Sequence, residues 1–168
     1  GTVDSSFIQG SGFNNSVKKV LLQSNGKILV GGLFTSYKGV AANRIIRLNA
    51  DGSRDSGFTI GTGFDSDINA IAFDNQVVGR IYVIGSFTSY NGTAVGGIAR
   101  LNADGSLDTT FTTGTGLIGI GYDVFVLTDG RVLAAGRITG YNGVSSLYHL
   151  ICINPDGSRD NTYATTTT

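Results

Sequence analysis

The sequence contains no Trp, no Met and no Glu, and it has a single Pro, a single Cys and a single His among its 168 residues. One cysteine, Cys152, excludes an internal disulfide and a cysteine-based metal cluster. One histidine, His149, leaves little from which to build a zinc site or a catalytic triad. Good helix formers are scarce, whereas Gly, Asp, Asn, Ser and Thr, the residues of turns, are abundant. These features together predict an all-β protein.

Neither sign of charge predominates, because 12 basic residues balance 12 acidic ones and neither kind gathers into a block. The basic surface that nucleic acid binding requires is therefore not expected, and we expect neither nucleic acid nor anionic lipid as a partner. The apolar runs have the length of strands, far below the roughly 20 residues of a membrane-spanning helix. We therefore expect a soluble chain with no membrane insertion.

The sequence is dominated by one unit that occurs three times. The stretch GKILVGGLFTSYKGV at residues 26–40 returns as GRIYVIGSFTSYNGT at 79–93 and as GRVLAAGRITGYNGV at 130–144. The length fits one domain, and four marker aspartates, Asp4, Asp55, Asp108 and Asp160, divide it into units 4–54, 55–107 and 108–159. Residues 160–168 begin a fourth unit. The first residue is Gly, which suggests a processed chain or a segment of a longer protein.

Each unit is predicted to contain three clear strands and one short strand. The central run is almost continuously apolar, which predicts a strand covered on both faces. Gly32, Gly85 and Gly136 interrupt it at equivalent places and predict a bend or a close backbone approach. The predicted strands are a short first segment at 7–8, 58–60 and 111–112, an inner strand at 17–23, 68–73 and 122–127, a central strand at 28–30, 81–84 and 132–135, and a last strand at 44–49, 97–102 and 149–154.

Four strands in roughly 50 residues correspond to one blade of a β-propeller. The predicted fold is therefore three tandem four-stranded repeats that form a partial β-propeller. Closed propellers have about four to eight blades, so three units need completion by a homo-oligomer or by further repeats of a longer chain. The alternative is a β-trefoil, in which three four-stranded units close within one monomer.

The repeated residues resemble a known family. The pattern of Asp-Gly-Ser-x-Asp, Gly-x-Gly-Phe, an apolar strand, Gly-Lys/Arg, Gly-x-Phe-Thr-Ser-Tyr-Asn-Gly and Ile-x-Arg-Leu-Asn resembles the delta-60 repeats over essentially the whole chain. The resemblance implies a β-propeller fold and a place in bacterial secreted or surface proteins or in phage structural proteins, without an assigned activity. The third copy diverges, because Cys152 stands where Arg47 and Arg100 stand in the first two.

The Asp-Gly-Ser-x-Asp turns are weak candidates for calcium sites, because oxygen-bearing side chains alternate along them. The spacing does not fit a calcium loop, because Phe58 would occupy the place of the bidentate Glu. We favour local hydrogen bonds from Asp and Ser to the turn backbone, and we expect no metal and no cofactor. The weak metal candidates are Asp51, Asp55, Asp104, Asp108, Asp156 and Asp160.

Other signals of chemistry are weaker. Residues 114–119 match the dinucleotide fingerprint Gly-x-Gly-x-x-Gly, but a strand follows where a helix is required. His149 and Cys152 are three positions apart on one predicted strand, so they point to opposite faces. A glycoside hydrolase needs two carboxylates, and the aspartates outside the repeated turns would have to supply them. These are Asp65, Asp67, Asp74, Asp123 and Asp129.

Tyr37, Tyr90 and Tyr141 precede equivalent turns, the second and third of which contain Asn91 and Asn142. Aromatic rings beside amides can stack on sugars or anchor a protein contact, which makes these five residues candidate ligand-binding residues. The competing interpretation is that each Tyr packs over its own turn and stabilises the blade, and we favour it.

Every prominent polar feature repeats, which suits architecture better than one active site. The sequence therefore predicts a non-enzymatic structural or recognition module of a bacterial surface protein or of a phage tail or fibre, located outside the cell, on its surface or in a virion. A carbohydrate-binding module that uses the Tyr turns is the second hypothesis, and a hydrolase is the least favoured.

Overall fold

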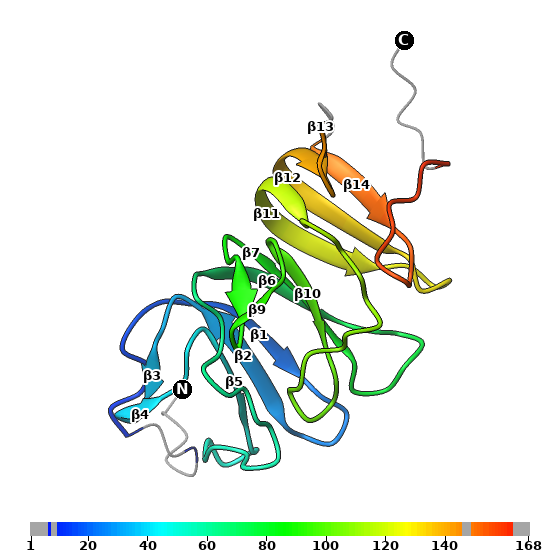
Figure 1. Ribbon diagram of the computed structural model, residues 1–168. Helices are drawn as coiled ribbons and strands as arrows, with labels where there is room; N and C mark the ends of the chain where they lie inside the picture. Colours follow the sequence, from blue (N-terminus) through cyan, green and yellow to red (C-terminus); the bar gives the residue numbers. More distant parts are fainter. Residues whose placement is uncertain (1–6, 8–9, 146–148, 163–168) are drawn as a thin grey trace.

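The computed structural model describes residue 7, residues 10–145 and residues 149–162, and the regular structure in these residues is all strand, without a helix (Figure 1). No helix in this part of the chain could cross a membrane. Each unit forms its own antiparallel sheet with a central strand between two others. The sheets are β1 (Val17–Leu22), β2 (Ile28–Gly32) and β5 (Ile45–Leu48), then β6 (Ile68–Phe73), β7 (Ile81–Gly85) and β10 (Ile98–Leu101), then β11 (Leu117–Val126), β12 (Val132–Tyr141) and β14 (Leu150–Ile153).

A short hairpin follows each central strand. Its strands are β3 (Ser36–Tyr37) with β4 (Val40–Ala41), β8 (Ser89–Tyr90) with β9 (Thr93–Ala94), and the end of β12 with β13 (Val144–Ser145). The two turn residues have positive φ in every copy, for example 46° at Asn91 and 78° at Gly92. Two positive φ values define the type I′ turn, whose twist matches that of a tight antiparallel hairpin.

In the second and third units the short strand lies elsewhere than predicted. Residues 58–60 and 111–112 are not strands, because Thr59 and Thr112 donate one backbone hydrogen bond each to the Asp-Gly-Ser turn at the end of their own unit. The chain instead returns along the last strand directly after that turn, where Arg54, Leu107 and Arg159 each form a single β-bridge. Asp4, Ile8, residues 146–148 and residues 163–168 of the predicted units lie outside the described residues.

Gly32, Gly85 and Gly136 lie beside a β-bulge of the inner strand. A Cβ atom on these glycines would overlap the carbonyl oxygens of Ser16, Asp67 and Ile120, respectively. The predicted close backbone approach is therefore confirmed.

The three sheets stack in chain order, and Figure 1 shows the second sheet between the first and the third. Strand β6 packs on β1 and β2, and β11 packs on β6 and β7. Among the described residues, the strands of the first and third sheets have no more than marginal contact with each other. We call the sheet face toward the preceding unit its entry face and the opposite face its exit face. The units form an open row of blades, and this is the β-propeller arrangement and not the closed threefold arrangement of a trefoil.

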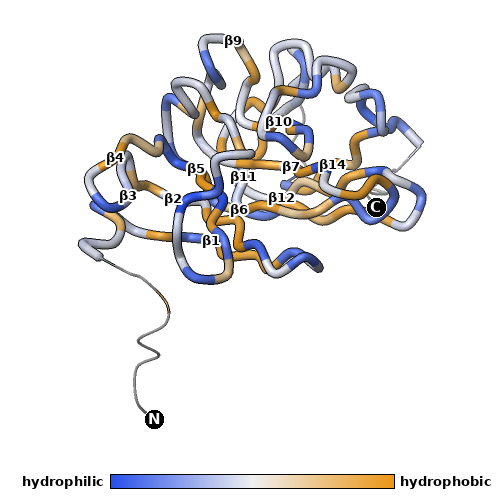
Figure 2. Tube along the Cα trace, turned by 90° about the horizontal axis from the view of Figure 1, so that it is seen from below, coloured by the Kyte–Doolittle hydropathy of each residue, from blue (hydrophilic) through white to orange (hydrophobic). Residues whose placement is uncertain are grey.

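Two apolar cores lie between the sheets. Leu29 and Ile45 on the first exit face meet Ile68, Ile71 and Val83 on the second entry face. The second core joins the second and third sheets, and it contains Tyr82, Ile84, Ile98, Val124, Val132 and Ala134. In Figure 2 the strands are mostly orange and the turns mostly blue or white, because apolar residues are concentrated in the strands that face these cores.

Candidate functional site

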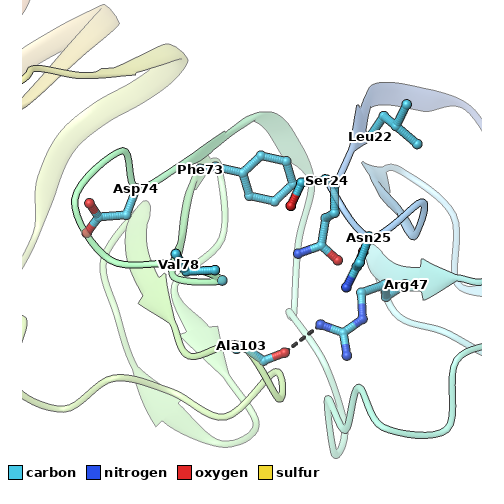
Figure 3. Close-up of a pocket in the computed structure, with 10 residues that line it drawn as sticks. Leu22, Ser24, Asn25, Arg47, Phe73, Asp74, Val78 and Ala103 are labelled. Carbon is cyan, nitrogen blue, oxygen red and sulfur yellow. Dashed lines mark hydrogen bonds between the residues drawn. The ribbon is translucent and has the colours of Figure 1, made fainter.

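A pocket of about 460 Å³ opens where the turns of the first and second sheets meet (Figure 3). Leu22 and Asn25 line one side, and Phe73 and Val78 line the other. Asp74 is the single carboxylate among the lining residues, and Figure 3 shows it pointing away from the cavity. Its Oδ1 accepts the backbone N–H groups of its own loop, and its Oδ2 lies 3.5 Å from Arg80 Nη1. The lining thus lacks the pair of carboxylates that a glycoside hydrolase needs.

The marker aspartates are the centres of the polar network at this end of the sheets. Asp55 is buried, and its Oδ2 accepts hydrogen bonds from Arg47 Nε at 2.6 Å and from Lys27 Nζ at 2.8 Å. Arg47 also donates from Nη1 to the carbonyl oxygen of Ala103 in the next unit, and its guanidinium lies 4.8 Å from the Phe58 ring centroid. A single side chain therefore links a buried carboxylate, an aromatic ring and the neighbouring blade.

The second unit repeats this network. Arg100 Nε donates to Asp108 Oδ2 at 2.8 Å, and Arg80 Nε lies 3.3 Å from the same oxygen. Arg100 Nη1 donates to the Pro155 carbonyl of the third unit, and its guanidinium lies 4.8 Å from the Phe111 ring centroid. The recurrence shows that the Arg and the marker Asp belong to the junction between blades.

The third unit departs from the network because Cys152 replaces the Arg. Burial raises the pKa of the Cys152 thiol above its ordinary value. Asp160 accepts a 2.7 Å hydrogen bond from Arg131 Nη1, and Arg131 also pairs with the exposed Asp129. The basic residue that precedes the central strand, Lys27, Arg80 or Arg131, thus approaches the marker Asp in all three units.

The pKa values of two marker carboxylates, Asp55 and Asp108, are lowered in the folded protein. Burial alone would raise the pKa of Asp55, but hydrogen bonds from Lys27 and Arg47 outweigh it and lower the pKa to about 2. The pKa of Asp108 is also lowered, because hydrogen bonds from Thr110 and Arg100 outweigh the effect of burial. Both groups remain ionised at neutral pH, as structural ion pairs require.

The first Asp of each Asp-Gly-Ser turn caps the turn itself. Asp51, Asp104 and Asp156 each accept the backbone N–H of the Ser two residues later, at 2.8 to 2.9 Å. The pKa values of all three are lowered, with the Ser side chain as the main cause. In the described residues, no group of three potential ligands approaches the geometry of a metal site. The six weak metal candidates therefore divide between turn caps and ion pairs.

The three tyrosines of the hairpins are buried and do not stand on the surface. Tyr37, Tyr90 and Tyr141 donate from their hydroxyl groups to the carbonyl oxygens of Gly52, Gly105 and Gly157, the glycines of the Asp-Gly-Ser turns. Burial raises the pKa values of Tyr90 and Tyr141 above the ordinary range. A ring held in this way joins hairpin to turn, as the structural interpretation requires, and no ring face is presented to a sugar.

The hairpin amides also face the protein. Asn91 Oδ1 accepts the backbone N–H of Thr62, and Asn142 Oδ1 accepts that of Thr115. A Cβ atom at Gly61 or Gly114 would overlap these amide groups, which accounts for the repeated Gly-x-Gly turn. Residues 114–116 therefore form a junction between a turn and a hairpin, and β11 begins at Leu117, inside the fingerprint, where a nucleotide site needs a helix.

The remaining aspartates have local partners. Asp65 accepts three hydrogen bonds from Thr88 and Ser89, which outweigh burial and lower its pKa to about 2. Asp67 lies 3.3 Å from Arg44 Nη1, and Asp123 accepts the N–H of Val124. His149 precedes β14 and is exposed, whereas Cys152 within β14 is buried.

A family model described as a domain of unknown function (DUF5122) beta-propeller matches residues 23–58, 79–111 and 127–163. These three segments cover more than half of the chain. The chain belongs to this β-propeller repeat family. Each matched segment contains the basic residue, the central strand, the Tyr hairpin and the marker Asp, so the family pattern coincides with the network described above. Comparison of the sequence with curated proteins found no match.

Sequence reasoning missed Lys27, Arg80 and Arg131 as partners of the marker Asp, and Arg47 and Arg100 as links between blades. Their signal was present, because each recurs at a fixed place in the β-propeller repeat. The sequence did not show which groups these residues contact, because the partners lie far along the chain. Arg47 and Ala103, for example, are 56 positions apart.

Proposed function

We propose that this chain is a non-catalytic structural or recognition module, a β-propeller segment of a bacterial surface protein or of a phage tail or fibre, located outside the cell, on its surface or in a virion. The observation that carries the proposal is that the repeated polar groups bond to one another within the scaffold. The marker aspartates bond to Lys and Arg, the hairpin tyrosines bond to turn carbonyls, and the turn aspartates cap their own turns.

The resemblance of the three units to delta-60 repeats supports the same assignment, because such repeats occur in large surface and phage structural proteins. The open row of blades supports it further, since a propeller segment gains closed packing by association with further repeats or with another chain. Carbohydrate binding through the Tyr turns is not retained as a second candidate, because the three rings are buried.

Immunoelectron microscopy with antibodies against the purified chain tests this proposal in the source bacterium and in any phage particles that it produces. We expect label on the cell surface, or on the tail or fibre of the particles. Label confined to the cell interior in uninfected cells, with none on particles, would contradict the proposal. A screen of chromogenic glycosides should show no turnover, and specific turnover that is lost in a single Asp→Asn variant would establish an enzyme instead.

A further inference from the structure

The two outer faces of the row, the first entry face and the third exit face, are built like the inner ones. Val20, Ile71 and Val124 are equivalent residues of the three inner strands. They pair with Val30, Val83 and Ala134, respectively, which occupy the same place in the three central strands. Ile71 is 2% exposed and Val124 is 6% exposed, because the preceding sheet covers them, whereas Val20 is 57% exposed. Val17 and Leu22 lie on the same face of β1 as Val20 and are also exposed. The inner strand of the first sheet therefore presents apolar side chains to solvent at positions that are covered in the other two sheets, whereas Val30, Ile46 and Leu48 on the same face are buried in a cluster with Phe13 and Phe34.

An apolar hollow on the first entry face shows where a further blade would pack. It is lined by Phe13, Val17, Val20, Val30 and other apolar residues of the first unit. On the second and third entry faces the equivalent surface is filled by the preceding sheet. The chemistry of a suitable partner is therefore that of an exit face of the same repeat.

The third exit face also exposes apolar side chains whose equivalents on the inner exit faces are covered. Phe125 is 62% exposed there, and its equivalents, Leu21 and Ala72, pack into the two inner cores. Leu133 and Ala135 on β12 are half-buried, whereas Tyr82 and Ile84 at the same places in β7 are buried. At the position of Arg47 and Arg100 this face carries Cys152, so the Arg of the inner exit faces is replaced by an apolar group.

The sizes of the side chains also match. At the first junction a small exit residue, Gly31, faces the large entry residues Ile68 and Ile71, since a Cβ on Gly31 would overlap Ile71. At the second junction the order is reversed, because Ile84 lies over Gly121. The third exit face has Ala135 at this position, and the first entry face offers Val17 and Val20. A small residue on one outer face thus meets two residues of medium size on the other, which keeps the combined volume of the junction.

We propose that a second copy of this chain closes the ring, with the third exit face of each copy packed on the first entry face of the other. The proposal deepens the proposed function, because it names the partner that completes the propeller. Contact between unlike faces forms a ring or an open filament, depending on whether the rotation closes. Two copies give six blades, which lies within the usual range of about four to eight, whereas three copies would exceed it.

Light scattering after size-exclusion chromatography tests the proposal at micromolar concentration. The purified protein should have a mass in solution of twice the 17.5 kDa of one chain. Val20→Asp on the entry face and Phe125→Lys on the exit face should each give a monomer, because each spoils both junctions of a two-chain ring. Val40→Asp is the matched control, because Val40 is 57% exposed like Val20 but lies on the β3–β4 hairpin. This control should leave the dimer intact, and circular dichroism should show all three variants folded.

Mixing the two monomeric variants separates packing of unlike faces from packing of like faces. In a mixed dimer one junction is unsubstituted and the other brings the introduced Lys and Asp to opposing faces, so native mass spectrometry should detect a dimer with one copy of each variant. Two entry faces packed on each other would instead leave Phe125→Lys dimeric, and the mixture would not recover.

A monomeric wild-type chain, an open-ended series of oligomers or a dimer insensitive to Phe125→Lys would each overturn the proposal. None of these results would bear on the proposed location outside the cell or in a virion. Label confined to the cell interior would remove the proposed function and leave the mass of the chain unchanged, so the two failures are distinguishable.

Discussion

Asp108→Asn tests the claim that the repeated polar residues hold the blades together. The substitution keeps the shape of the side chain and an oxygen that can accept from Thr110, but it removes the negative charge beside Arg100. The Arg100 side chain is 3% exposed, so its guanidinium would be left as a buried cation without its counter-charge.

Loss of one partner of a buried ion pair costs about 3 to 5 kcal/mol of the free energy of unfolding. Arg80 Nε lies 3.3 Å from the same carboxylate, so a second cation also loses a counter-charge. We therefore expect the loss to lie within that range and not below it. Urea denaturation at one fixed protein concentration measures the loss, since a self-associating chain has a concentration-dependent stability.

The matched control is Asp129→Asn, which removes the charge of a half-exposed carboxylate 2.7 Å from Arg131. An exposed pair is worth about 0 to 1 kcal/mol, so this variant should unfold close to the wild type. Arg100→Cys in the Asp108→Asn background copies the residue of the third unit and should recover part of the loss, because it removes the unpaired cation. Equal destabilisation by Asp108→Asn and Asp129→Asn, or a double variant without coupling, would show that Asp108 does not stabilise the junction through its charge.

Three further predictions concern a second marker Asp, a hairpin Tyr and a glycine of a central strand. The folded pKa of Asp55 is about 2, below its unfolded value of roughly 3.9, so its contribution of about 2 kcal/mol is present above pH 4 and is lost as the pH falls toward 2. Acid titration of the unfolding free energy should therefore be shallower in Asp55→Asn than in the wild type, and parallel curves would contradict this. Tyr90→Phe should lose about 1 to 2 kcal/mol, because the buried Gly105 carbonyl loses its hydroxyl donor, whereas Tyr122→Phe on the half-exposed Tyr122 should be neutral by the same denaturation assay. Gly85→Ala should lower the free energy of unfolding by about 2 kcal/mol or more, because its Cβ would overlap the Asp67 carbonyl. Gly57→Ala is the control, because a Cβ at Gly57 would have ordinary contact distances. Equal thermal midpoints for the two variants would be inconsistent with the close approach at Gly85.

The sequence predicted the strands that carry the repeat. The inner strand at residues 68–73 coincides with β6, and the central strands lie within β2, β7 and β12. These segments are apolar, regularly spaced and bounded by turn residues, so local pattern alone identifies them. Strand β11 begins five residues before the predicted start, because it continues through Gly119 and Gly121, where β-bulges accommodate residues that weaken a strand.

The contacts of the candidate site were less accessible to sequence reasoning. A repeat shows which residues recur, but it does not show which of them meet across neighbouring units. Lys27 and Asp55 are 28 positions apart, and the hydrogen bond from Tyr90 reaches a turn 15 positions on. A Tyr beside a polar turn also fits an exposed position, and only the fold of the hairpin over its sheet decides between exposure and burial. The hairpins themselves escaped prediction because their strands have only two residues, although Asn91-Gly92 and Asn142-Gly143 signal the turn.

A crystal structure of the purified chain tests most directly whether the outer faces are unfilled blade junctions. We expect the Val17, Val20 and Leu22 side chains to be covered by the Phe125, Leu133 and Ala135 side chains of a second copy, in a ring of six blades. A ring closed within one copy, or outer faces open to solvent in every molecule of the crystal, would contradict this account of the repeat.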